Sequence, residues 1–220
     1  MKKSVKALLV VLCVVLLVAC GVMGTLAYLT AADEVVNTFT VGNVNIKLDE
    51  ADVNPDGTVI QGADRVKGNE YHLIPGRTYV KDPTVTVLKG SEEAYVRMKV
   101  TINCISQLRA ILGEDFLPQN YVEGWDNSVW VYETTVEDAQ NNAVTYEFRY
   151  HEKVNAFEAT EDMTLEALFT NFTLPGEING EQLATISDLQ INVVGNAIQV
   201  VGFENDENAA WAAFDAQISG

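Results

Sequence analysis

Apolar and polar residues alternate along several short segments of this chain, and this period of two restricts what the chain can fold into. Successive side chains of a β-strand point to opposite faces of a sheet, so alternation predicts a strand with one buried face. The clearest case ends at Cys104, where Val96, Met98, Val100, Ile102 and Cys104 alternate with Tyr95, Arg97, Lys99, Thr101 and Asn103. Further half-buried strands are predicted over 129–133, 144–151 and 168–174.

Glycine and proline divide the remaining β-type segments. A strand over 189–203 is expected to break near Gly195 and Asn196, and Pro75-Gly76 predicts a turn. Pro83 interrupts Tyr79 to Leu88 and cannot donate to a ladder, so an edge strand is expected there. Residues 49–69 are polar and contain glycine, which predicts a loop or hairpin.

Helical spacing is confined to two segments. Ser106 to Leu112 predicts a short helix, and Asp206 to Ile218 predicts a closing helix capped by Asn205 or Asp206, with Trp211, Phe214 and Ile218 on one side. Strands separated by turns, without regular intervening helices, favour an antiparallel β-sandwich over a parallel sheet. The fold class is therefore mainly β, with a few short helices and a C-terminal helix.

The amino terminus has the order of a secretory leader. Lys2, Lys3 and Lys6 precede an uncharged stretch from Leu8 to Ala19, and small residues follow. Three outcomes stay open: cleavage after Ala27, which leaves Tyr28 first; acylation of Cys20 in a lipobox-like string; or an uncut span over 7–29, long enough to cross a bilayer. After cleavage at Ala27, Cys104 is the one remaining cysteine, so no intramolecular disulfide is expected, and Cys104 is interpreted as a small core residue.

The charge of the working protein is strongly negative. The whole chain has 14 basic and 31 acidic residues, a net charge of −17. Three of the basic residues belong to residues 1–27, which contain no acid, so their removal leaves 11 basic groups and a net charge of −20. A nucleic-acid partner is excluded, because it requires a basic face, and a membrane contact is expected only through the leader or a lipidated Cys20.

Catalytic and metal-binding motifs are largely missing from the sequence. His151-Glu152 is not followed by a second histidine one turn later, and His72 has no spaced partner, so neither fits a zinc-protease helix. Asp52, Asn54 and Asp56 match the first half of a calcium loop, but Ala63 stands where a bidentate glutamate is required. No cofactor is therefore expected, and calcium at these three residues is the one weak metal candidate.

The amino-terminal half resembles a known exported family. The strings GTLAYLT over 24–30 and NTFTVGNV over 37–44, with Asp33-Glu34 between them, are similar to the start of TasA/camelysin-type proteins. Leu73 to Gly76, Lys81-Asp82 and the strand over 95–104 extend the resemblance to about residue 105. The resemblance implies cleavage by a SipW-type signal peptidase, secretion to the surface or matrix of a Gram-positive bacterium, and a jelly-roll-like β-sandwich.

The resemblance also implies two functions, of which the structural one is expected and the peptidase is the alternative, because the chain has no recognisable zinc-protease motif. TasA-like members polymerise into biofilm matrix fibres by inserting the mature amino terminus of one subunit into the next as a strand, which makes the chain its own partner, with other matrix proteins as further candidates. Camelysin-like members are classed as metallopeptidases. A third hypothesis is a lipid-anchored binding protein. The expected organisation is a signal peptide over 1–27, an amino-terminal strand segment over 28–48 with Val35, Phe39 and Val41 as donor residues, and a β-sandwich with helical insertions over 49–220.

Overall fold

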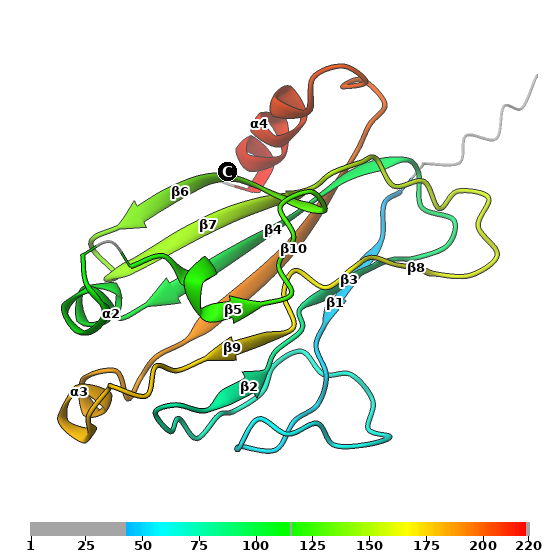
Figure 1. Cartoon of the computed structure of the whole chain (residues 1–220). Coiled ribbons are helices and arrows are strands. Elements are labelled where there is room, and N and C mark those ends of the chain that lie inside the picture. Colours follow the sequence, from blue (N-terminus) through cyan, green and yellow to red (C-terminus); the bar gives the residue numbers. More distant parts are fainter. Residues whose placement is uncertain (1–42, 115, 219–220) are drawn as a thin grey trace, which may run out of the picture. The chain divides into compact units, whose positions relative to one another are not determined.

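Strands dominate the computed structural model, which describes residues 43–114 and 116–218 (Figure 1). The helices are α2 (Ile105–Leu112), the 3-10 helix η1 (Pro118–Tyr121), α3 (Gly180–Thr185) and α4 (Glu207–Ile218). The strands are β1 (Ile46–Asp49), β2 (Thr78–Val80), β3 (Thr84–Val87), β4 (Ala94–Asn103), β5 (Val122–Glu123), β6 (Trp130–Asp138), β7 (Ala143–Tyr150), β8 (Met163–Thr164), β9 (Asn171–Thr173) and β10 (Ile191–Gln199).

Within the described residues, the strands form three antiparallel sheets. Their orders are β1-β3-β8, β10-β4-β7-β6 and β2-β9-β5. The four-stranded sheet is held by long registers, with Ile191 opposite Ile102 and Val100 opposite Tyr146. The expected class, a mainly β antiparallel sandwich with few short helices and a C-terminal helix, is confirmed.

The core lies on the inner face of the four-stranded sheet. The alternating residues of β4 and β7 point into it and pack against Val85 and Val87 of β3. The two strands contribute Val96, Met98, Val100, Ile102, Val144, Tyr146, Phe148 and Tyr150, all buried. The period of two that predicted these strands therefore also identified their core faces.

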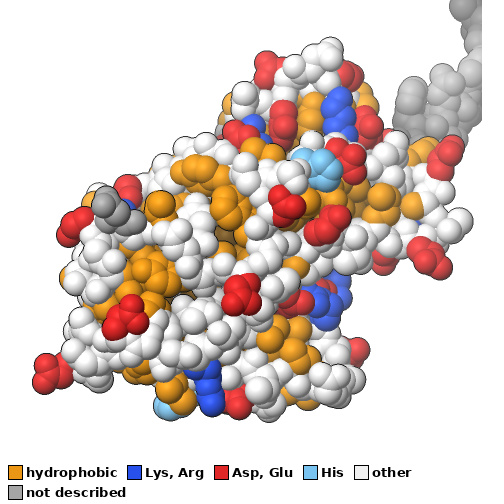
Figure 2. Space-filling view, in the orientation of Figure 1, with side chains coloured by type: hydrophobic (Ala, Val, Ile, Leu, Met, Phe, Trp, Pro, Cys, Tyr) orange, Lys and Arg blue, Asp and Glu red, His pale blue; other side chains and the backbone are white. Residues whose placement is uncertain are grey.

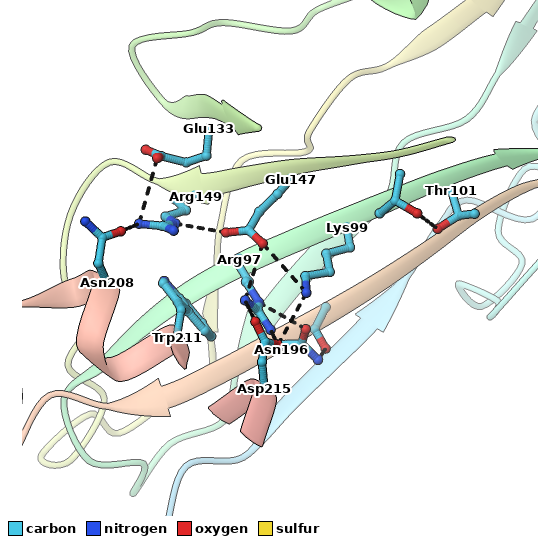
Figure 3. A network of polar contacts seen from close by, with 12 residues as sticks. Arg97, Lys99, Thr101, Glu133, Glu147, Arg149, Asn196, Asn208, Trp211 and Asp215 are labelled. Carbon is cyan, nitrogen blue, oxygen red and sulfur yellow. Dashed lines mark hydrogen bonds and ion pairs between the residues drawn. The ribbon is translucent and has the colours of Figure 1, made fainter. Parts of the chain in front are cut away.

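The outer face of the same sheet is covered in part by α4, as Figure 3 shows. Asp206 caps this helix by accepting the Ala209 N–H at 2.9 Å, and Trp211 is buried against the sheet. Phe214 is half-buried, whereas Ile218 is exposed and does not pack as expected. Because α4 lies over β4, Tyr95 and Arg97 are also buried, so the expectation that β4 exposes one whole face is wrong.

Arg97 joins α4 to two strands of the sheet. Its guanidinium donates to the carboxylates of Asp215 and Glu147 and lies 4.3 Å from the Trp211 ring centroid. Arg149 binds Glu147 at 3.0 Å and Asn208 at 2.8 Å in the same network (Figure 3). The only fully buried guanidinium among the described residues is therefore neutralised from both sides.

The segment around Pro83 differs from the expected edge strand. It forms two strands in different sheets, because the chain leaves β2 at Val80 and enters β3 at Thr84. β3 is hydrogen-bonded to both β1 and β8, so it is a central strand. Pro83 occupies the crossing, where its missing N–H costs no ladder bond. The predicted turn at Pro75-Gly76 is present, with Gly76 at φ 78°.

Gly195 does not break its strand, contrary to expectation. β10 runs unbroken from Ile191 to Gln199, with Gly195 opposite Met98. A Cβ atom at Gly195 would lie 3.2 Å from Val85 Cγ2 and 3.6 Å from Leu48 Cβ. The glycine therefore allows the sheet of β1 and β3 to approach β10 closely.

Cys104 lies just beyond β4 instead of inside it. It precedes α2 with a left-handed backbone, φ 54°, and its side chain is half-buried against the core. Burial, with a contribution from Asp188, raises the pKa of its thiol above the ordinary value. The core interpretation holds for its packing, whereas its placement in the strand was wrong.

Candidate functional site

A groove of about 970 Å³ opens between two edge strands, β1 and β10. Leu48 to Glu50 line it from the end of β1, and Leu189 to Val193 line it from the start of β10. The remaining walls come from α3 and the residues after it, from the loop over 67–73, and from Lys81, Pro83 and Phe172.

The backbone of β10 presents an open edge to this groove. Antiparallel pairs alternate between hydrogen-bonded and non-hydrogen-bonded residues. Asn103 donates to the Gln190 carbonyl and Val200 donates to the Glu93 carbonyl, so the even-numbered residues of β10 bond to β4. Ile191 and Val193 therefore direct their N–H and C=O groups away from β4, toward the groove.

The facing edge of β1 is open at Ile46 and Leu48, and it ends at Glu50, which exchanges backbone hydrogen bonds with Val66. Leu88 donates to the Asn45 carbonyl, so the odd-numbered residues of β1 bond to β3. Ile46 and Leu48 turn their backbone groups to the other side. The two strands come close at Gly195 and diverge from there, since Glu50 and Ile191 lie on separate walls of the groove. Figure 1 shows that β10 begins on the side of α3.

Two aromatic residues of the groove wall, Tyr71 and Phe172, pack with the buried Tyr79. Tyr71 packs edge-on against Tyr79 and Phe172, with centroids 5.8 and 5.3 Å away, and Tyr79 stacks on Phe172 at 5.0 Å. Tyr71 also donates to the Val80 carbonyl at 2.9 Å. Burial, together with the charge of Glu50, raises the pKa of the Tyr71 phenol far above its ordinary value, so the phenol stays protonated.

A buried polar cluster adjoins these rings. Lys81 Nζ lies 2.6 Å from Glu50 Oε2, and Asn69 Nδ2 lies 2.9 Å from Glu50 Oε1. Lys81 is 8% exposed and Glu50 4% exposed. The carboxylate of Glu50 therefore bridges an amine and an amide out of bulk water.

A second set of charges surrounds Asp49. Arg65 binds Asp49 at 2.5 Å and Asp82 at 2.8 Å, and Lys47 binds Asp49 at 2.6 Å. Burial alone would raise the pKa of Asp49, but hydrogen bonds from Lys47 and Arg65 lower it below the ordinary value. Asp49, which also lines the groove, is therefore held as a carboxylate.

A smaller apolar cleft lies on the inner side of the four-stranded sheet. It has a volume of about 90 Å³ and is lined by Trp125, Phe148, Phe116 and Leu168, among others. Leu189 and Ile191 contribute to both cavities. The start of β10 therefore separates the groove from the core.

The predicted site residues fall in three places. Asn54 and Asp56 lie in the turn closed by the Val53–Val59 bridge, and Asp52 directly precedes it. In the turn, Asp56 accepts from Thr58 N and Oγ1, and Asn54 donates to Thr58. His72 lies on the groove wall and His151 follows β7, so they belong to separate elements. Across 43–114 and 116–218, no three His, Cys, Asp or Glu side chains gather as metal ligands. The remaining predicted residues, Cys20, Ala27, Tyr28, Val35, Phe39 and Val41, lie outside the described residues.

The sequence contains a signal for the buried cluster, which the alternation of apolar and polar residues does not reveal by itself. Glu50 continues the inward phase of Ile46 and Leu48, and Lys81 shares the parity of buried Tyr79. A charged residue on an apolar phase requires a buried partner. The partners are distant in sequence, so the pattern alone does not identify them.

Comparison of the chain with models of known protein families, with curated proteins and with solved structures gives no match. None of the helices in the described part of the chain is long and apolar enough to cross a membrane.

Proposed function

We propose that this protein is a non-enzymatic, exported structural subunit that assembles with copies of itself by β-strand addition. In this proposal, residues 28–41 of one copy enter the groove between β1 and β10 of the next. The observation that carries the proposal is the pair of open strand edges on the two walls of one groove. An extended segment placed there gains backbone hydrogen bonds from Ile191 and Val193, and its alternate side chains gain the groove walls.

The donor segment has the pattern that such an acceptor requires. Val35, Phe39 and Val41 share one parity, so they reach one face of an added strand. One residue, Gly42, separates this segment from Asn43, whose carbonyl accepts from Glu92 at the start of the described chain. A contact from the amino terminus of one copy to the groove of another does not close on itself, and such contacts generate filaments.

Surface charge supports regulated rather than spontaneous association. Figure 2 shows acidic side chains scattered over the visible face, with few basic ones. With a net charge of −20 after residue 27, subunits repel one another at low ionic strength. Export and cleavage after Ala27 would release the donor segment outside the cell, where salt screens this repulsion.

Electron microscopy of the Tyr28–Gly220 protein at rising concentration tests the proposal. We expect fibres from this protein and none after deletion of residues 28–41. A full-length mature variant carrying Val35→Asp, Phe39→Asp and Val41→Asp keeps the segment but should not assemble, because the aspartates lose the apolar contacts with groove residues such as Leu48 and Ile191 and add negative charge to a groove that already contains Asp49 and Glu50. Equal fibre yield from the deletion variant would contradict strand donation.

A further inference from the structure

Lys81, Glu50 and Asn69 are arranged for a covalent reaction as well as for an ion pair. The two oxygens of the Glu50 carboxylate hold the Lys81 amine at 2.6 Å and the Asn69 amide nitrogen at 2.9 Å. Amines attack amides when the two are held together and a neighbouring carboxyl group moves the protons. We propose that Lys81 and Asn69 form an intramolecular amide cross-link with Glu50 as the proton shuttle.

The orientation of Asn69 is fixed by groups that can only donate or only accept. Its Oδ1 accepts the Val53 N–H at 3.0 Å, and its Nδ2 donates to Glu50 and to the Ala51 carbonyl at 2.8 Å. A flipped amide would place nitrogen against an N–H and oxygen against a carboxylate and a carbonyl. The leaving nitrogen therefore faces Glu50, and the carbonyl oxygen faces a backbone donor.

The reaction proceeds in steps that balance. Lys81 transfers a proton to Glu50 Oε2, and its free amine attacks Asn69 Cγ. The negative charge that develops on Oδ1 is stabilised by the Val53 N–H. Glu50 then protonates Nδ2, and the Cγ–Nδ2 bond breaks to release ammonia. Glu50 accepts the second proton from the former amine and passes it to the ammonia, so the nitrogen leaves as ammonium and Glu50 is again a carboxylate. One amide replaces another, so no oxidant, reductant or metal is required.

The nucleophile and the proton shuttle are shielded from solvent. Lys81 and Glu50 are buried, whereas Asn69 is half-buried where it lines the groove beside them. Burial of the amine and the carboxylate strengthens the electrostatic interaction between them. The rest of the network gives each reacting atom a partner before the reaction, which holds the geometry.

The cross-link has a structural consequence for the groove. It closes a ring from Asn69 to Lys81 that contains the Pro75-Gly76 turn and β2. This ring supplies part of the groove wall through residues 69–73. Cys104 is the one cysteine after residue 27, so the amide would take the place of a disulfide as a covalent staple. The proposal stands whether or not the groove accepts a strand.

Tryptic peptide mapping of the purified, folded protein tests the cross-link. Trypsin cuts after Lys67, Arg77 and Lys89, and an amide on Lys81 blocks cleavage there. We expect a branched species that joins 68–77 to 78–89 and has lost the mass of one ammonia. The proposal is overturned if the folded protein, after prolonged incubation, still gives the unmodified peptides 68–77 and 78–81 in the same yield as its other tryptic peptides.

Two variants and a control assign the roles. Lys81→Arg keeps the positive charge but removes the nucleophile, and it should abolish the branched peptide completely. Glu50→Gln removes the proton shuttle and should reduce its yield at least tenfold. Lys67→Arg changes an exposed lysine of the same groove and should leave the yield unchanged. If a variant fails to fold, the wild-type peptide map alone decides, because the branched species is either present or absent.

Discussion

Arg97→Ala should destabilise this protein more than any other single change of a charged residue in the described chain. The Arg97 side chain is 1% exposed and pairs with Glu147, itself 10% exposed, and with Asp215, 43% exposed. Removing the guanidinium leaves the Glu147 carboxylate buried beside fewer donors and removes the platform on which Trp211 stacks. Breaking a buried ion pair from one side costs about 3–5 kcal/mol.

Urea unfolding at pH 7, followed by tryptophan fluorescence, measures this cost. We expect the free energy of unfolding to fall by about 3–5 kcal/mol, a large share of the 5–15 kcal/mol typical of a domain. Arg109→Ala is the matched control, since Arg109 binds Glu137 at 2.6 Å but the two side chains are 29% and 52% exposed. Exposed pairs contribute about 0–1 kcal/mol. Equal losses in the two variants would refute the reasoning that burial sets the value of the Arg97 network.

Three further outcomes follow from the structure. Gly195→Val should cost about 1–3 kcal/mol in urea unfolding, because its Cβ would lie 3.2 Å from Val85 Cγ2, whereas Gly180→Ala, with open space around it, should be near neutral. The hydrogen bond from Arg97 lowers the pKa of Asp215, so the stability that the ionised Asp215 contributes is complete above about pH 4 and is lost as the pH falls through the folded-state pKa. The free energy of unfolding of Asp215→Asn should therefore fall less steeply with acid than that of the parent, and equal slopes would count against this reasoning. Fibre yield should rise with salt, calcium or acid pH, because each reduces repulsion between subunits of net charge −20, and a yield that ignores all three would contradict the charge argument.

The strands were predictable because their signal is local. The alternation in β4 and β7 reports burial on a single face, and the turn at Pro75-Gly76 and the cap at Asp206 are also set by neighbouring residues. The pattern failed where a distant element changes the environment. Arg97 has the parity of an exposed residue, and it is buried because α4, more than 100 residues later, lies over it.

The same limit applies to the groove and its buried cluster. Considered with its neighbours in sequence alone, Gly195 predicts a break in the strand. The close approach of Val85 explains the glycine although the strand is unbroken. Pro83 suggests an edge strand, although the chain changes sheets there. Lys81, Glu50 and Asn69 meet only after β1 and β2 are placed, so their chemistry depends on tertiary structure.

Fibre assembly by a Val193→Pro variant tests the central claim most directly. The Val193 N–H points into the groove, so proline removes a donor for an added strand and leaves the bonds from β10 to β4 intact. Val194→Pro is the matched control, because it removes a bond to β4 and should unfold the sheet. We predict that the Val193→Pro protein stays folded but forms no fibres at concentrations where the parent assembles. Fibres from this variant in parental yield would show that β10 is not the acceptor edge.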